Sequence, residues 1–505
     1  MSNLAPLGLG AWLFIGLYLS SLLVIGVIAR RARREDTLND FYLAGHGFGF
    51  TVLFLTLFAT QYSGNTFFAF TGATYRTGYS WILSLHFMTT VVVGYLIFAP
   101  KLYQLSKARN YLTPTDFVTD RFGHRGLSLL VTMVMLAVLA NFLLAQLMAM
   151  GRAMQGLSGD GGGIAYIIGV ILLAAIMVIY GTLGGLRAIA WTDAIQGAIL
   201  GSGFIVLAIL LLDRFGPIEQ ATEIIRQRDY AGDSRYTLVP DANRTREWFS
   251  YIIAVGFGIC LYPQAIQRIY AARSARVLRK SLAVMVFMPL PTMLISLLAG
   301  IMALAYLPGL QGASADQIFG RVLREIQVHS TFGYGLVVLT MAAVLAAMMS
   351  TADSALLSIS SIFTKDLYKP LKGNAVSEAK LTRIGKICSW AVITLLIVLA
   401  ILLREKSSLV ALMDRKIDLL IQLFPTFMVG IHWRRMAATP VFVGLITGVS
   451  LALILAFGDF SFVHKGKLWG IHAGLVALIP NLLIALVGSS LAAPARTEMS
   501  SLGDR

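Results

Sequence analysis

The sequence predicts an all-α polytopic membrane protein, and three observations carry this prediction. Of its 505 residues, 57% are hydrophobic and 13% are charged, and the mean hydropathy is +0.76. Apolar stretches of roughly 20 residues, enough to cross about 30 Å of hydrocarbon, recur along nearly the whole chain. No long polar segment is left over for a separate soluble domain, so we treat 1–505 as one transmembrane domain.

We expect about 13 transmembrane helices. The first, at 7–29, is a retained span, because no basic stretch precedes it and no small-residue cleavage site follows it. Spans two to six cover 46–212, spans seven to eleven cover 247–431, and two C-terminal spans lie within 440–490. An odd number of spans in each set makes the second set enter from the opposite side, which predicts two inverted five-helix repeats. The expected span centres lie near residues 18, 59, 90, 138, 172, 201, 259, 293, 346, 394, 419, 449 and 479.

The formal charge of +16 indicates topology rather than nucleic-acid binding, because Lys and Arg concentrate in cytoplasmic loops of membrane proteins. If the N-terminus is outside, the expected inner loops are basic and the short outer loops are nearly bare. We therefore predict an external N-terminus, a cytoplasmic C-terminus and no nucleic-acid partner. The basic residues assigned to inner loops include Arg30, Arg31, Arg33, Arg34, Lys101, Lys107, Arg109, Arg121, Arg125, Arg268, Arg273, Arg276, Arg279, Lys280, Lys365, Lys369, Lys372, Lys380, Arg383, Lys386, Arg434 and Arg435.

The sequence lacks the phosphate-binding motif of ATP-driven pumps and any cysteine pattern for a metal or redox site. Cys260 and Cys388 have neither metal-ligand nor redox spacing. No GxxxxGK[ST] loop for nucleotide phosphates is present. We expect neither an enzyme nor an organic cofactor.

The first helix of each repeat contains residues that favour a break at the membrane midplane. Span two reads "TLFATQYSGNTFFAF", with Ser63, Gly64 and Asn65 at its centre, and span seven reads "VGFGICLYPQAIQRIY", with Gly256, Gly258 and Pro263. Each motif alone is also common in ordinary membrane helices. At matching positions they predict two broken helices whose free backbone groups can bind ions and solutes.

Span nine contains "MMSTADSALLSISS" at 348–361, an unusually polar stretch for a membrane helix. Its Ser and Thr residues form one stripe at helical spacing, which also suits simple helix packing. Packing does not explain Asp353, because a carboxylate at mid-membrane costs on the order of 3 kcal/mol. A second carboxylate, Asp193 in span six, has two readings: an ion ligand, or an interfacial residue that is paired with Arg187 or solvated by the cytoplasm. Oxygen ligands of this kind suit a small hard cation.

These segments resemble the sodium/solute symporter family, which includes sodium/proline, sodium/pantothenate, sialic acid and sodium/glucose symporters. The resemblance covers nearly the whole chain, and its most specific pieces are "GTLGGLRAIAWTDAIQ" at 181–196 and "MSTADSALLSISSIFTKDLYKP" at 349–370. It implies a leucine-transporter-like fold and a location in the plasma membrane, here the inner membrane of a bacterium. It also implies sodium-coupled import of a small organic solute by alternating access, with Na+ as the co-transported ion.

The resemblance further implies site residues by position. The sodium site would be formed by Ala59, Tyr62, Ala347, Ser350 and Thr351. A second cation site, present in some members, would be formed by Asp193, Ser350, Asp353 and Ser354. Asp353 departs from those members, which have serine there. Gln61 departs from the proline symporters, which have an aspartate, so we expect Gln61 to contact the solute rather than the cation.

The solute is expected at the midplane between the broken helices. Span eleven, "ALMDRKIDLLIQLFPTF", allows two readings: its charges reach the outer interface or pair locally, or Arg415 or Lys416 neutralises a carboxylate of the solute. The second reading favours a carboxylate-bearing solute such as an amino acid, pantothenate, a monocarboxylate or a sialic acid. The predicted substrate-binding residues are Gln61, Ser63, Asn65, Tyr262, Gln264, Gln267 and Arg415, with Asn141 and Gln146 as further candidates.

Three other functions are considered. A proton-coupled symporter of the same fold would use Asp353 and Asp193 as a proton site. A transporter-like sensor module would carry a kinase domain or a sizeable cytoplasmic tail, which the sequence does not have after the last span. "TDRFGHR" at 119–125 loosely resembles a loop motif of the major facilitators, but it follows the third expected span rather than the second. The lipid bilayer and a small solute are thus the expected partners.

Overall fold

The structure is a computed structural model, which describes residues 9–32, 35, 37–62, 64–158, 163–230, 236–329, 331–373, 376–404, 409–458, 460–464 and 466–492. At Asn65 and Ala347 only the backbone is described. The structure is almost entirely helical. Its α-helices are α1 (Leu9–Arg31), α2 (Leu38–Leu43), α3 (Phe50–Gln61), α4 (Gly64–Thr77), α5 (Leu83–Arg109), α6 (Pro114–Phe122), α7 (Arg125–Ser158), α8 (Ile164–Phe215), α9 (Ile218–Tyr230), α10 (Ala242–Ile259), α11 (Pro263–Ala271), α12 (Ala275–Met285), α13 (Pro289–Tyr306), α14 (Ile318–His329), α15 (Thr331–Ile362), α16 (Lys369–Lys372), α17 (Glu378–Leu402), α18 (Leu409–Leu420), α19 (Gly430–His432), α20 (Ala438–Phe457) and α21 (Ala473–Leu491).

Shorter elements connect or extend these helices. Three two-residue strands form an antiparallel sheet in the order β1-β2-β3, with Val463 opposite Leu468 and Leu468 opposite Ile471. The short elements are η1 (Ala44–His46), η2 (Gly78–Ile82), η3 (Gly312–Gln317), η4 (Phe363–Tyr368), η5 (Ile421–Leu423), η6 (Pro425–Val429), β1 (Val463–His464), β2 (Lys467–Leu468) and β3 (Ile471–His472).

The apolar helices agree with a polytopic membrane protein. Within the described residues, seven helical stretches are long and apolar enough to cross a membrane, or eight if the bent pair α10 and α11 is one span. Every expected span centre falls inside a helix. The count of about 13 crossings and the inverted repeat stay predictions.

Helix α8 contains a sharp kink that divides it into two parts. Its 52 residues correspond to about 78 Å of helix, more than twice the thickness of the hydrocarbon layer. At Gly185 the backbone leaves the helical region, with φ of 61° and ψ of −151°. A Cβ atom there would collide with the carbonyl oxygen of Phe41, so only glycine suits this position. The kink separates the two spans that the sequence predicts at 172 and 201.

Both helices predicted to be broken are interrupted at the expected places. α3 ends at Gln61, Tyr62 has extended backbone angles, and α4 begins at Gly64. α10 ends at Ile259, and α11 begins at Pro263 after a bend of 47°. Proline suits the first turn of α11 because no intrahelical hydrogen bond is required of it there.

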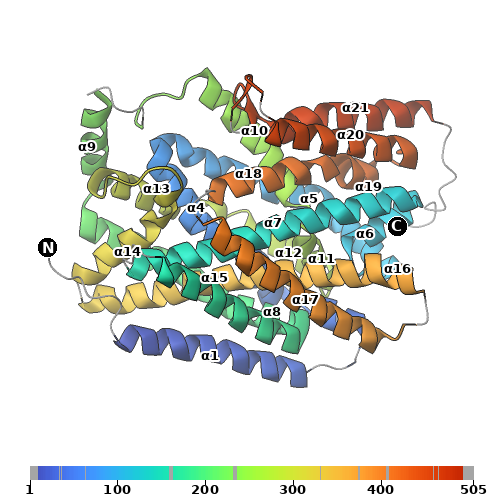
Figure 1. Cartoon of the computed structure of the whole chain (residues 1–505), viewed down its shortest axis with the longest axis horizontal. Helices are drawn as coiled ribbons and strands as arrows, with labels where there is room; N and C mark the ends of the chain where they lie inside the picture. The colour runs from blue at the N-terminus through green and yellow to red at the C-terminus, as the bar shows by residue number, and fades with distance from the viewer. Residues whose placement is uncertain are drawn as a thin grey trace.

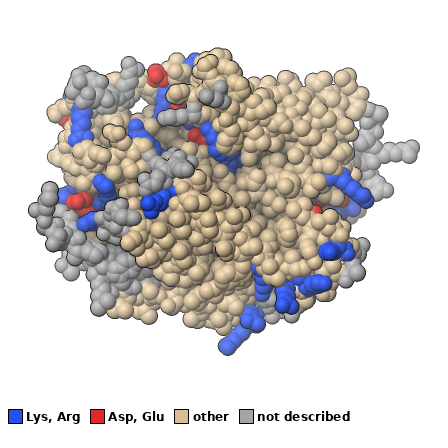
Figure 2. All heavy atoms as spheres, viewed as in Figure 1, with Lys and Arg blue, Asp and Glu red and all other residues tan. Residues whose placement is uncertain are grey.

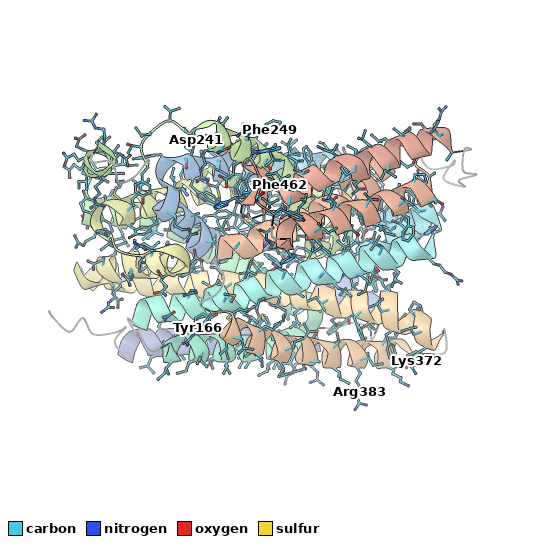
Figure 3. The ribbon with its side chains drawn as sticks, turned by 45° about the horizontal axis from the view of Figure 1, so that its top comes forward. Tyr166, Asp241, Phe249, Lys372, Arg383 and Phe462 are labelled. Carbon is cyan, nitrogen blue, oxygen red and sulfur yellow. The ribbon has the colours of Figure 1, made fainter. Side chains whose placement is uncertain are left out.

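The long helices run roughly along one axis of the molecule, with α20 and α21 side by side and α1 along α8 (Figure 1). The elements α6, α16 and α19 lie at one end, and α9 lies at the other (Figure 1). On the face drawn in Figure 2, most Lys and Arg lie toward the two ends, with a broad band of uncharged residues between them. Figure 3 places Lys372 and Arg383 toward the end that contains α16, which is the predicted cytoplasmic end.

Candidate ion and substrate site

The break between α3 and α4 leaves backbone oxygens available beside α15. The last carbonyl groups of a helix lack intrahelical partners. The Thr351 hydroxyl donates a hydrogen bond of 3.1 Å to the carbonyl oxygen of Ala59 in the last turn of α3. Tyr62 lies at the break and is fully buried. Ala59, Tyr62 and Thr351 thus lie where the sequence predicts a sodium site, while Ala347 lies one turn before Thr351 on α15.

The side chain of Ser350 points away from the break, toward the buried carboxylate of Asp193. Its hydroxyl donates to Asp193 of α8, and Thr56 of α3 donates to the same carboxylate. Asp193 is fully buried. In this structure Ser350 therefore joins α15 to α8, and Thr351 joins α15 to α3.

Arg268 is the main residue of the cluster that the sequence analysis missed. Assigning it to a cytoplasmic loop was wrong, because it lies in α11 and is only 1% exposed. Its guanidinium donates to Asp193 at 2.8 Å and to Thr56 at 2.7 Å. It also donates to Ser354 at 2.5 Å. Two signals were available: a buried Asp193 requires a compensating charge, and Arg268 is only one turn beyond Gln264.

The predicted second cation site is therefore assembled around a guanidinium. Asp193, Ser350 and Ser354 do lie together, through the contacts of Arg268 with Asp193 and Ser354. Asp353 faces the other way, where the hydroxyl of Tyr180 donates to it at 2.5 Å. A weaker bond of 3.3 Å joins it to Ser354. A second cation at Asp193 would have to displace the guanidinium.

The residues predicted to bind the solute fall into two groups. Gln267 is occupied, because its amide donates to Ser361 and accepts from Ser358, both at 2.6 Å. These bonds also provide hydrogen-bond partners for Ser358 and Ser361, the last two residues of the polar stripe on α15. Gln264 is fully buried, and neither end of its amide has a hydrogen-bond partner among the described residues. Gln61 accepts a hydrogen bond of 3.2 Å from Tyr95 on α5.

Two further candidates lie at the break and on α7. Tyr262 is buried at the break between α10 and α11, and its hydroxyl has no hydrogen-bond partner within the described part. The side-chain oxygen of Asn141 is likewise buried without a hydrogen bond. Ser63 lies outside the described residues, and Asn65 is the second residue of α4.

The charged residues of α18 point in different directions, and most of them are buried. Arg415 forms an ion pair of 3.1 Å with Asp418 and lies over the Phe457 ring of α20. Lys416 instead lies over Phe142, with its ammonium 3.9 Å from the ring centroid. Lys416 is 3% exposed, so the interpretation that these charges reach the outer interface is wrong for Lys416. The ion pair with Asp418 and the contact with Phe457 both join Arg415 to residues outside the predicted substrate set.

A polar cavity of about 740 Å3 opens beside the start of α10 and the three-stranded sheet. Asp241 and Phe462, labelled in Figure 3, are among its lining residues. Lys467 lines it too and lies between Glu247 and Asp414. Burial lowers the pKa of Lys467, but the two carboxylates raise it above its usual value overall. This cluster therefore keeps its ion pairs over the physiological pH range.

The opposite end of the two broken helices is closed by backbone contacts. The Phe48 amide donates to the Ala271 carbonyl at 3.2 Å, and the Arg273 amide donates to the Phe48 carbonyl at 3.0 Å. Nearby, burial and Asp116 raise the pKa of Asp366 to about 7. The segment before α3 and the end of α11 are thus joined at the predicted cytoplasmic end.

Two broken helices, one of which offers a carbonyl oxygen at its break to a hydroxyl of a third helix, are typical of a membrane transporter for an ion and a small solute. The sodium:solute symporter family matches residues 41–448, so the chain belongs to this family. The family and the relatives below are transporters rather than enzymes, and the chain is a plasma-membrane protein with a small-molecule substrate.

The curated relatives cover nearly the whole chain. A sodium/pantothenate symporter of Haemophilus influenzae is 26% identical over 500 residues, which is 96% of this chain and 97% of the relative. The osmoregulated proline transporter OpuE of Bacillus subtilis is 26% identical over 450 residues, with 87% of each chain covered.

The fold is similar to that of a solved transporter. The substrate-bound outward-open structure of a Na+-coupled sialic acid symporter has a TM-score of 0.75 and 19% sequence identity. The alignment covers 97% of this chain and 100% of the neighbour. This neighbour has the leucine-transporter fold, in agreement with the sequence prediction.

Proposed function

We propose that the chain is a sodium-coupled symporter that imports a small carboxylate-bearing organic solute by alternating access. We place it in a bacterial inner membrane, with the N-terminus outside and the C-terminus in the cytoplasm. The observation that carries the proposal is the contact of Thr351 with the Ala59 carbonyl at the break of α3. Relatives named for sodium-dependent pantothenate and proline transport support this type of reaction.

The proposed sodium ligands are the backbone oxygens of Ala59, Tyr62 and Ala347 and the hydroxyls of Ser350 and Thr351. Sodium is a hard cation that prefers such oxygen ligands. For this, the Thr351 hydroxyl has to direct its lone pairs at the ion instead of donating to Ala59. Ser350 has to exchange its bond with Asp193 for the ion, so the hydroxyl group of each residue rotates on binding.

Coupling follows from the position of the ion between two elements that move relative to one another. Sodium bound between α3 and α15 would favour the state in which these helices lie close together. If the solute binds better to this state, each ligand raises the affinity for the other by the same factor. Opening toward the cytoplasm would separate the two helices and release both.

We further propose that one sodium ion is coupled to each transport cycle. The guanidinium of Arg268 already compensates Asp193, and it contacts Ser354 as well. At the expected second cation site, the Arg268 guanidinium thus takes the place that a second sodium ion would occupy. A proton at Asp353, which is the alternative coupling ion, would bind on the other side, beside Tyr180.

Uptake into proteoliposomes tests the proposal. The purified protein would be reconstituted and given a panel of radiolabelled organic acids, amino acids and sugars, under an inward sodium gradient or an equal potassium gradient. We expect concentrative uptake of at least one carboxylate with sodium only. Uptake that follows a proton gradient and ignores sodium would instead support the proton-coupled alternative.

A further inference from the structure

Lys416 is a buried cation at the centre of the helical bundle. It belongs to α18, and its side chain is 3% exposed. Its ammonium lies 3.9 Å from the ring centroid of Phe142 on α7 and 5.6 Å from that of Tyr262. The two rings stack on each other, with centroids 4.9 Å apart and planes 17° apart. The ammonium therefore rests against an aromatic wall at the break between α10 and α11.

No carboxylate of the described residues lies within ion-pair distance of this ammonium. The neighbouring acids on α18 are engaged elsewhere. Asp414 accepts from Tyr251 at 2.7 Å and lies 3.4 Å from Lys467. Asp418 accepts from the Gly474 amide at 2.8 Å and pairs with Arg415. A buried ammonium with aromatic partners alone is under-compensated, because a cation–π contact replaces only part of its hydration.

Polar groups without hydrogen bonds surround the same break. The Tyr262 hydroxyl and both ends of the Gln264 amide are buried without hydrogen-bond partners among the described residues. The first turn of α11, which starts at Pro263, directs the positive end of the helix dipole toward the break. α18 itself packs against α4, α7 and α10, the helices at and between the two breaks. The Tyr262 hydroxyl, the Gln264 side-chain NH2 group and the helix dipole can each interact favourably with an anion.

We propose that the ammonium of Lys416 binds the carboxylate of the transported solute, with the Phe142 and Tyr262 rings beside its apolar part. This inference rests on the proposed function and specifies its solute class as a small monocarboxylate without an ammonium group. An amino acid would bring its own ammonium close to Lys416, and no acidic side chain of the described residues is there to receive it. Gln61, which is neutral, accepts its bond from Tyr95 instead.

The test compares charged and uncharged versions of the same solutes. Purified protein in sodium would be titrated with lactate against lactamide and with pantothenate against pantothenol, with L-proline as the zwitterion. Ligand binding stabilises the folded protein by RT ln(1 + [L]/Kd), so melting temperatures measured over a range of ligand concentrations allow apparent affinities to be compared. We expect a carboxylate to raise the melting temperature at concentrations at which its uncharged analogue and proline do not.

Two substitutions at the same position identify the residue responsible. Lys416→Met keeps the length of the side chain and removes its charge, so affinity for the carboxylate should fall on the order of 30-fold or more. The preference for carboxylate over amide should disappear with it. Lys416→Arg should retain the preference. The matched control is Lys372→Met, since Lys372 is exposed at the far end of the molecule (Figure 3).

The sodium response separates failure of this inference from failure of the proposed function. Sodium alone should still raise the melting temperature of Lys416→Met, which also verifies that the variant is folded. Unchanged carboxylate affinity in Lys416→Met would overturn the inference, as would its loss in Arg415→Met instead. Preferential binding of proline or of the uncharged analogues to the wild type, or no response to either carboxylate, would also overturn it. A wild type that ignores sodium would contradict the proposed function itself.

Discussion

The hydroxyl of Thr351 on α15 donates to the carbonyl oxygen of Ala59 at the end of α3, at a distance of 3.1 Å. The two residues are 292 positions apart in the chain, and the contact lies where α3 is interrupted. A hydroxyl and a free carbonyl at a helix break can share one small cation instead of a hydrogen bond. This contact therefore provides the link between ion binding and the relative position of the two helices.

Replacing Thr351 by valine should weaken sodium binding, because the shape of the side chain is kept while its oxygen is lost. We expect the sodium concentration for half-maximal uptake to rise about tenfold, which corresponds to roughly 1.4 kcal/mol. Thr351→Ser retains the oxygen and should stay within about twofold of the wild type. Sodium titrations of uptake distinguish the two variants, and an equal loss in both would argue against a direct ligand role.

The broken helices could be predicted from the sequence, and the partners of their charged residues could not. Gly258 and Pro263 flank the interruption of the second broken helix, because glycine and proline act locally on the backbone. Arg268 was missed because a basic residue near a helix end resembles a loop residue when its partner is 75 positions away. The choice between Arg415 and Lys416 depended on the rotation of α18, since adjacent residues point about 100° apart on a helix.

The Arg268 and Asp193 pair should behave as one unit in unfolding experiments. Arg268→Gln leaves a buried carboxylate without its charge partner, which costs on the order of 3–5 kcal/mol. Asp193→Asn leaves the guanidinium in the same situation. The double variant should lose much less than the sum of the two single losses, as expected for directly interacting groups.

Thermal unfolding in detergent measures these effects, with the exposed Arg273→Gln as the control. Additive losses would show that the two side chains do not interact in solution.

Asp366 should make the stability of the protein depend on pH at the predicted cytoplasmic end. Burial and then Asp116 raise its pKa from 3.8 to about 7, so the folded protein holds this proton more tightly than the unfolded chain. The stabilising contribution is fully present below about pH 4 and is lost as the pH rises through about 7. Asp366→Asn should therefore flatten the dependence of the melting temperature on pH between about 5 and 8.

The exposed Asp213→Asn serves as the control for this prediction, and it should leave the pH dependence unchanged. A wild-type profile that is retained in Asp366→Asn would assign the pH dependence to another group.

Transport of one sodium ion with one monocarboxylate should move no net charge across the membrane. The guanidinium beside Asp193 replaces a second sodium ion, and the ammonium of Lys416 binds the carboxylate. Both of these charges stay in the protein, so only one positive and one negative charge are transported. Uptake into proteoliposomes should then change less than about twofold when a potassium diffusion potential of 100 mV is imposed, although each net charge moved would gain about 2.3 kcal/mol. Strong acceleration by an inside-negative potential would indicate a second cation.

The most direct test of the account is the melting temperature of the purified protein in sodium against potassium at equal ionic strength, without any solute. Binding of sodium to the folded protein at Ala59 and Thr351 predicts a higher melting temperature in sodium, which rises with its concentration and is reduced in Thr351→Val. Identical melting temperatures in the two salts at all concentrations would contradict a sodium site at this break.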